Sequence, residues 1–166
     1  MLYAGEVYDL NVLSLQSRVF PKVILTDIDI ETKTINNNII ITILYEKIDT
    51  QNAIEFQKMI QRNYKTLKDF DLSVKLLEYE NFSQQKELSS AYFFLLTDNS
   101  EQLVLIANEI TKKQRLTFCY DENYLDYGVM MGLDISEKVS LPLNFKSLKQ
   151  SKIKLQNSIF KVVKIR

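Results

Sequence analysis

Two apolar runs decide the fold: Ile39-Ile40-Ile41-Thr42-Ile43-Leu44-Tyr45 and Ala91-Tyr92-Phe93-Phe94-Leu95-Leu96. Neither run alternates apolar with polar residues in the way of a half-exposed strand, and both are typical of strands buried on both faces of a parallel sheet. Helical patterns follow the two runs, over residues 50–67 and 98–113. Because strands alternate with helices, the sequence predicts an α/β fold with a mostly parallel sheet and helices on both faces.

The rest of the chain completes a single-domain, three-layer fold with a sheet of five to six strands. Apolar patterning predicts further helices over residues 7–25, 145–150 and 157–164, and further strands over residues 72–79 and 116–120. Residues 129–135 and 139–143 predict a C-terminal antiparallel hairpin. Pro142 is expected to place the second arm at an edge or to end it there. A capping box of Asp98 and Glu101 is expected to open the helix over residues 98–113.

Composition excludes most familiar enzyme chemistries. The 166 residues include no histidine, three glycines and one cysteine. Histidine-dependent sites, phosphate-binding glycine loops, an intramolecular disulfide and a cysteine-built zinc site are therefore excluded. The 21 basic and 21 acidic residues balance, so the net charge gives no reason to expect nucleic-acid binding. We expect no catalytic residue and no cofactor; an enzyme that uses carboxylates or tyrosine as acid and base is the alternative.

Acidic residues alternate at Asp27, Asp29 and Glu31, a pattern that a hard cation would favour. A calcium loop of the EF-hand kind needs glycine at its sixth position and glutamate at its twelfth. Counted from Asp27, those positions hold Thr32 and Asn38. We therefore expect no metal site, and we expect these acids to point into solvent.

Charge is unevenly distributed along the chain. Residues 145–166 contain seven bases and no acid, which leaves 14 bases against 21 acids in residues 1–144. This basic segment is interpreted as a surface for an acidic partner or for anionic lipid headgroups, peripheral to a membrane at most. The alternative is a solvated amphipathic segment whose apolar residues face the core. The candidate partner-binding residues are Lys152, Lys154, Ile159, Lys161 and Lys164.

Ligands of open α/β sheets bind outside the carboxyl ends of the strands. Those ends are expected at Glu46-Lys47, Thr97-Asp98 and Asp121-Glu122. A cluster of Tyr120, Tyr124 and Tyr127 precedes Gly128, and its rings could stack on a planar ligand or cover the edge of the sheet. The candidate ligand-binding residues are Thr97, Asp98, Asp121, Tyr124, Gly128 and Met130.

The chain begins Met1-Leu2-Tyr3-Ala4-Gly5-Glu6. Residues 1–4 are interpreted as the small-residue end of a secretory signal whose hydrophobic part is gone, and an ordinary cytosolic start is the alternative. The single domain is then expected over residues 5–166.

Three stretches in the second half follow a recognisable order. They are Asp121-Glu122-Asn123-Tyr124-Leu125-Asp126-Tyr127-Gly128-Val129-Met130-Met131, then Leu143-Asn144-Phe145, then Leu155-Gln156-Asn157-Ser158-Ile159-Phe160-Lys161-Val162-Val163. In that order they resemble the "SD…F…GGMI" segment, the "INL" turn and the "ISS.LL.LA" ending of the YfiR family of small periplasmic regulators. The chain departs from the family where Gly128-Val129 replaces the glycine pair and Tyr120 replaces the serine.

The resemblance implies a periplasmic protein that binds the outer segment of a membrane-bound diguanylate cyclase and represses it, in control of cyclic-di-GMP and biofilm formation. The family offers no catalytic residues to carry over, and its cross-linking cysteines are absent here. A second hypothesis is a periplasmic small-molecule-binding module that feeds a sensor kinase or a transporter. A homodimer is compatible with either hypothesis.

Overall fold

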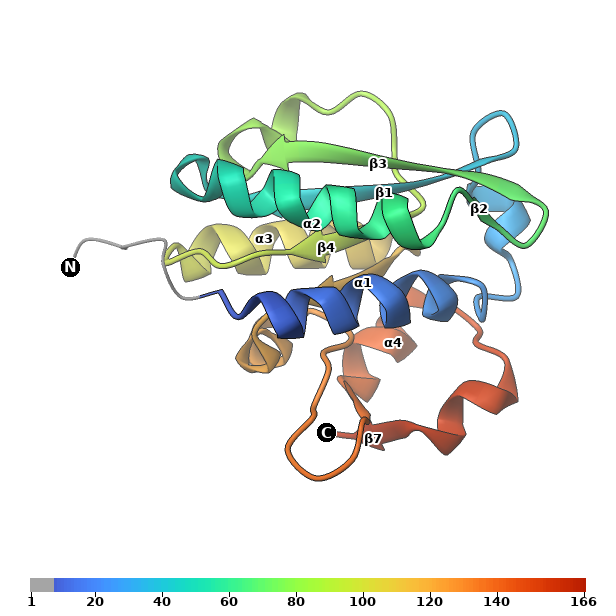
Figure 1. Ribbon diagram of the computed structural model, residues 1–166. Coiled ribbons are helices and arrows are strands. Elements are labelled where there is room, and N and C mark those ends of the chain that lie inside the picture. The colour runs from blue at the N-terminus through green and yellow to red at the C-terminus, as the bar shows by residue number, and fades with distance from the viewer. Residues whose placement is uncertain (1–7) are drawn as a thin grey trace.

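A five-stranded sheet lies at the centre of the computed structural model, which describes residues 8–166 (Figure 1). Its strands run in the order β2 (Thr66–Leu67), β3 (Phe70–Glu78), β1 (Asn38–Tyr45), β4 (Ala91–Phe94) and β5 (Leu116–Cys119). All neighbours are parallel except β2, which pairs antiparallel with β3. The predicted α/β fold with a mostly parallel sheet is confirmed. The expectation for residues 1–4 lies outside the described residues.

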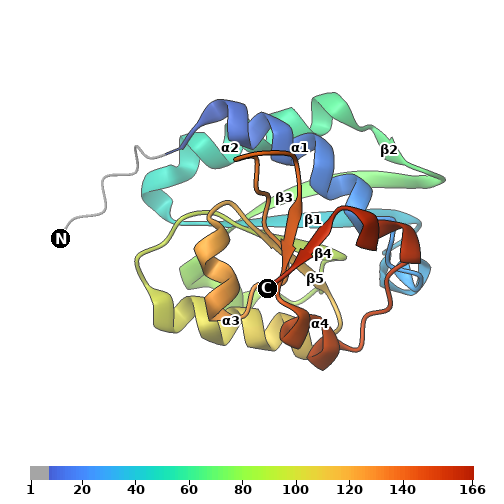
Figure 2. The same cartoon turned by 90° about the horizontal axis from the view of Figure 1, so that it is seen from below.

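Four α-helices form the two outer layers. Figure 2 shows α1 (Leu10–Ile24) and α2 (Thr50–Asn63) on one face of the sheet, and α3 (Ser100–Lys112) and α4 (Phe145–Ser151) on the other. Each face has its own core, because successive side chains of a strand point to opposite faces. In β1, Ile43 belongs to the cluster that includes α1 and α2, and Leu44 belongs to the cluster that includes α3.

The C-terminal hairpin extends the sheet beyond β5. Met131 bridges to Phe118 of β5 on one side and to Leu143 of β6 (Leu141–Leu143) on the other. A second bridge, between Asp134 and Ser140, makes the two arms antiparallel, as predicted. Beyond β6 lies β7 (Val163–Ile165), which pairs with it in parallel and forms a small second sheet.

Two expectations for this end of the chain are wrong. The final segment is a 3₁₀ helix over Asn157–Lys161 followed by strand β7, instead of a helix over residues 157–164. The physical reason is the free edge of β6, where Leu141 N donates to Val162 O and Arg166 N donates to Leu143 O. β6 is therefore covered by β7 and is no edge, whereas the other outcome expected of Pro142 holds to within one residue, because the strand ends at Leu143. Pro142 is tolerated because only its carbonyl oxygen is used, as acceptor from Gly132 N.

The start of α3 also differs from expectation. Asn99, rather than Asp98, is the N-cap, and its side chain accepts a hydrogen bond from Gln102 N at 3.0 Å. Asp98 is exposed one residue before the cap. Both residue types cap helices well, so the pattern alone could not decide between neighbours.

Candidate functional site

The carboxyl ends of β1 and β4 form the point where the topology reverses. The chain leaves β1 through α2 to reach β3 on one side, and it leaves β4 through α3 to reach β5 on the other. Ligands of open α/β sheets bind in the crevice at such a point. Glu46 follows β1 and Thr97 comes shortly after β4, so the topology places both residues at this end of the sheet, as predicted.

Tyrosine hydroxyls occupy the backbone groups at this point. Tyr124 donates to Thr97 O at 3.0 Å and accepts from Thr97 N at 2.9 Å. Tyr8 accepts from Leu96 N at 2.8 Å and donates to Asp49 Oδ2 at 3.0 Å. The groups that a ligand would use at the end of β4 are therefore already paired within the chain.

The crevice between the two strands is closed by side chains as well. Thr97 Oγ1 donates to Glu46 Oε1 at 2.6 Å, which joins the segments that follow β4 and β1. The ring of Tyr8 packs against that of Tyr120 with 4.9 Å between centroids. Tyr120 and Tyr124 thus pack against other parts of the chain at the carboxyl end of the sheet.

Two titratable groups at this end, Tyr124 and Cys119, are poorly suited to acid–base or nucleophilic chemistry. Burial raises the pKa of Tyr124 to about 12, and nearby Asp121 adds to the effect. Burial also raises the pKa of the Cys119 thiol well above its usual value. The Cys119 side chain is fully buried, and its Sγ donates to Met131 O at 3.4 Å. Near neutral pH both groups stay protonated, so neither is an activated base or nucleophile.

The other predicted ligand-binding residues are not gathered at the crevice. Asp121 caps the 3₁₀ helix Glu122–Tyr127 by accepting from Asn123 N at 3.0 Å. Gly128 ends that helix with φ +104°, a conformation that favours glycine, and lines a separate cavity of about 400 Å³ beside α3 and α4. Met130 is fully buried in the core. Of the six, Thr97 and Tyr124 are joined through the Tyr124 hydroxyl, and Asp121 also contacts Tyr124, because Asp121 O accepts from Tyr124 N at 3.0 Å.

Sequence reasoning missed Tyr8, the residue that closes the crevice from the start of the chain. Its partner Leu96 is 88 positions away. No periodicity or motif marks a single tyrosine ahead of a helix as a partner for a distant strand end. A tyrosine hydroxyl that hydrogen-bonds to a distant backbone group leaves no pattern in the neighbouring sequence.

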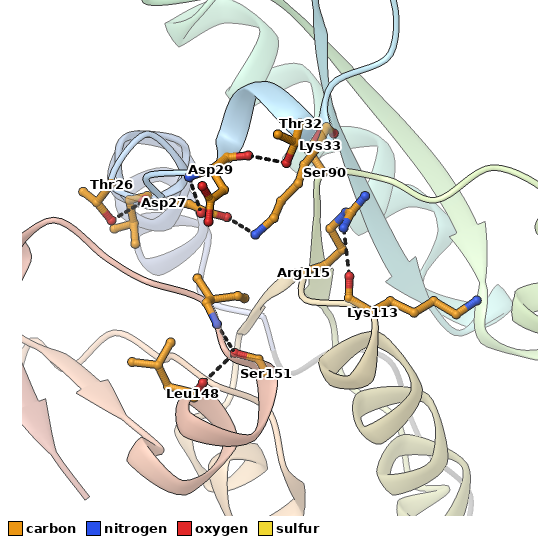
Figure 3. A network of polar contacts seen from close by, with 12 residues as sticks. Thr26, Asp27, Asp29, Thr32, Lys33, Ser90, Lys113, Arg115, Leu148 and Ser151 are labelled. Atoms are coloured by element: carbon orange, nitrogen blue, oxygen red, sulfur yellow. Dashed lines mark hydrogen bonds and ion pairs between the residues drawn. The ribbon is translucent and has the colours of Figure 1, made fainter.

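A second polar cluster lies at the opposite, amino end of the strands (Figure 3). Lys33 Nζ pairs with Asp27 Oδ2 at 2.5 Å, and both residues are buried. Lys33 O accepts from Ser90 Oγ at 2.7 Å, and Ser90 directly precedes β4. Arg115, directly before β5, donates through Nε to Ser89 O at 3.1 Å. Asp27 therefore points inward, and the expectation that all three alternating acids face solvent is wrong for it.

The cluster links the segment of residues 27–33 to the start of β4, which is a structural role. Asp27 Oδ1 accepts from Asp29 N at 3.0 Å, so both carboxylate oxygens are used. Partial burial lowers the pKa of the Arg115 guanidinium, and Asp27 acts in the opposite direction. Within residues 8–166, no group of three acidic, cysteine or histidine side chains is arranged to hold a metal ion.

The C-terminal region forms a groove with α1. This α1 groove has a volume of about 450 Å³. It is lined by Leu15, Arg18, Val19, Lys22, Val23, Thr26, Leu141, Ser158, Ile159 and Val162. A neighbouring cavity of about 430 Å³ shares Val162 and lies between the hairpin loop and β7.

The predicted partner-binding residues are divided between these surfaces. Ile159 lines the α1 groove but is 7% exposed and packs in the core, so for this residue the alternative of an apolar side chain that faces the core holds; Lys161 and Lys164 line the neighbouring cavity. Lys152 and Lys154 are exposed but lie in the lining of neither. The structure thus brings three of the five expected residues to one side of the molecule.

Comparison with known proteins shows the fold. No family model and no curated protein matches this chain. A conserved domain protein from Vibrio cholerae O1 biovar El Tor str. N16961 is similar with a TM-score of 0.56 and 10% identity, over 86% of this chain and 59% of that one. An ABC domain from Streptococcus pneumonia, in complex with L-Trp, is similar with a TM-score of 0.60 and 8% identity, over 90% of this chain and 61% of that one.

The chain spans about six-tenths of the length of each of these two structures. No α-helix among the described residues is long and apolar enough to cross a bilayer. At such low identity the likeness concerns architecture only. The chain is an α/β domain, similar in fold to these two proteins.

Proposed function

We propose that this chain is a non-catalytic periplasmic regulator that binds and represses the outer segment of a membrane-bound diguanylate cyclase. The observation that carries the proposal is the α1 groove, an apolar depression that contains the expected partner residue Ile159. The resemblance of residues 121–163 to the YfiR family supplies the class of partner. The family segment supplies one wall of the groove, through Leu141, Ser158, Ile159 and Val162, and the α1 region supplies the other.

The chemistry of the described residues suits control by contact. A repressor acts by having different affinities for two states of its partner, and a coupling free energy of about 1–3 kcal/mol changes signalling usefully. Such a protein needs a rigid scaffold and an accessible surface, and it needs no activated nucleophile. The buried thiol of Cys119 and the neutral phenol of Tyr124 fit that requirement.

Cyclic-di-GMP measurement tests this proposal. The chain, fused to an export signal, is co-expressed with the membrane diguanylate cyclase encoded nearest to its gene, and cyclic-di-GMP is measured by mass spectrometry. We expect the nucleotide level to fall several-fold. The matched control is the same chain without the export signal, which cannot meet the outer segment of the cyclase. An unchanged level with the exported chain, at equal expression, would contradict the proposal.

A small-molecule-binding module for a sensor kinase or transporter is the second candidate. Its support is the topological switch point, together with the similar fold of a domain that was solved in complex with L-Trp. In this alternative a ligand displaces the Tyr8 hydroxyl from Leu96 N. Tyr8→Phe would then raise the affinity for a ligand found in a calorimetric screen of free amino acids. The regulator proposal expects no amino acid to bind at the crevice in that screen.

A further inference from the structure

We propose that the α1 groove binds an acidic amphipathic helix of the partner protein. This inference rests on the proposed function and specifies the chemistry of the contact. It is carried by the shape of the groove, by the exposed Val162 and the partly exposed Leu15 and Val19 in its lining, and by the charges around it.

The length of the groove fits a helix of about two turns. Leu15 and Val19 are partly exposed four positions apart on α1, and Val23 lies buried one turn further along the same face. The lining of α1 runs from Leu15 to Val23, which corresponds to about 12 Å along the helix axis. Ile159 and Val162 also line the groove from the C-terminal segment. Apolar grooves of this kind accept amphipathic helices through anchors at positions i, i+3 or i+4, and i+7.

Apolar side chains remain accessible along this side of the molecule. Val162, which lines both the groove and the neighbouring cavity, is 47% exposed. Val139, on the hairpin loop beside that cavity, is 51% exposed. Single exposed apolar residues are ordinary, but their grouping around one depression marks an interaction site.

The charges around the groove favour an acidic occupant. Two bases line the groove itself, Arg18 and Lys22, and three bases line the neighbouring cavity, where the only acids are Asp134 and Glu137. Neither Arg18 nor Lys22 forms a salt bridge with any residue in the described part of the chain. Both side chains are exposed, so their charges are available to acids on the rim of a bound helix.

The same charges argue against a second copy of this chain as the occupant. A two-fold contact brings the same patch of both copies together. Arg18 and Lys22 would then face the bases of the other copy, and like charges across an interface are unfavourable. An acidic helix removes this conflict and covers the partly exposed Leu15 and Val19 at the same time.

Binding of a synthetic helix to the full chain tests the inference. The probe is a stapled 18-residue peptide with leucines at helical spacing and glutamates on both flanks. The matched peptide has the same residues in scrambled order. We expect the amphipathic probe to bind at least tenfold more tightly in fluorescence anisotropy, with an affinity that falls as salt is raised. Equal binding of the two peptides would overturn the inference.

Charge reversal on the chain locates the binding site. R18E with K22E is expected to weaken probe binding at least tenfold, because it reverses both bases of the groove. The control reverses two exposed bases elsewhere, K112E in α3 with K146E in α4, and should change the affinity less than twofold. V162E should also abolish binding, whereas L105E, at a 70% exposed position of α3, should not. If the groove and control variants behave alike, the groove is not the binding site.

Other results separate this inference from the proposed function. If R18E with K22E represses the cyclase as well as the native chain does, the groove is wrong and the function stands. If the native chain does not repress the cyclase but binds the probe in the groove, the proposed function fails and the helix site stands. A native dimer that V162E dissociates in analytical ultracentrifugation would overturn the inference, because a second copy would then occupy the groove.

Discussion

The two ends of the central sheet are closed by different chemistry. At the carboxyl end, the neutral hydroxyls of Tyr8 and Tyr124 pair with backbone groups that follow β4. At the amino end, Lys33 and Asp27 form a buried ion pair that is joined to Ser90 (Figure 3). The carboxyl end, where related folds bind ligands, is thus held by hydroxyl hydrogen bonds, two of them to the carboxylates of Asp49 and Glu46, and the amino end is held by a buried ion pair that is costly to separate.

The difference between the two ends of the sheet indicates which part of the molecule contributes most to stability. A buried charge that loses its partner is strongly unfavourable, whereas a phenol that loses a backbone group can turn to water if the site opens. We therefore expect the amino end to act as the fixed part of the scaffold. The proposed surface for partners, the α1 groove, lies along α1 and the C-terminal segment rather than at either closed end.

The largest effect is expected from Lys33→Met. The substitution leaves the Asp27 carboxylate buried without its cation, and the free energy of unfolding should fall by about 3–5 kcal/mol. Urea unfolding followed by far-UV circular dichroism measures the loss. The control is Lys75→Met, which removes one member of an exposed pair with Glu87 and should change the free energy by less than about 0.5 kcal/mol.

A second variant shows whether charge is the cause. Asp27→Asn together with Lys33→Met removes both charges and keeps an acceptor for Asp29 N. At least half of the loss from Lys33→Met should be recovered. A double variant as unstable as the single one would mean that packing, and not the uncompensated charge, holds this end together.

A smaller effect is expected from Tyr124→Phe at the carboxyl end. The substitution removes the hydroxyl that pairs with both Thr97 N and Thr97 O. Loss of a partly buried hydrogen-bonding group lowers the free energy of unfolding by about 1–2 kcal/mol. The same urea experiment measures it. A loss as large as that of Lys33→Met would contradict the contrast between the two ends.

Alkaline pH should weaken the carboxyl end by about 1 kcal/mol. The pKa of Tyr124 is raised from 10.0 to about 12 in the folded protein, so the unfolded chain loses this proton first as pH rises. Stability is therefore fully present below pH 10 and falls between pH 10 and pH 12. From pH 8 to pH 11 the native chain should lose about 1 kcal/mol more than Tyr124→Phe does. If both proteins lost the same free energy of unfolding, Tyr124 would not contribute to the loss of stability at alkaline pH.

The sequence predicted the parts of the fold that depend on local pattern. The apolar runs predict β1 and β4, and helical spacing predicts α2 and α3 after them. Thr97 was placed at the end of β4 by the same reasoning. The helix expected over residues 50–67 is too long, because α2 ends at Asn63 and Thr66–Leu67 pair with β3 as strand β2. Strand β7 was missed, because a three-residue strand forms only where β6 offers its edge.

The chemistry of the two ends could not be read from local pattern. A sequence of alternating acids is the same whether all of them face water or one is buried in an ion pair. Asp27 is buried because the 3₁₀ helix Ile30–Lys33 brings the Lys33 ammonium next to its carboxylate. Tyr8 meets Leu96 across 88 positions. Side-chain partners of this kind depend on tertiary geometry, whereas periodicity reports only which face of an element is buried.

The smallest effect is expected from Glu46→Gln, at the half-buried one of two carboxylates, Glu46 and Asp49, that accept hydrogen bonds at the carboxyl end. Glu46 Oε1 accepts from Thr97 Oγ1, and the amide oxygen of glutamine accepts the same hydrogen bond. Glu46 is only half-buried, so water solvates its charge and little is lost with it. The free energy of unfolding should change by less than about 0.5 kcal/mol. A change of several kcal/mol in urea unfolding would show that this end also depends on charge, and the contrast with Lys33 would then fail.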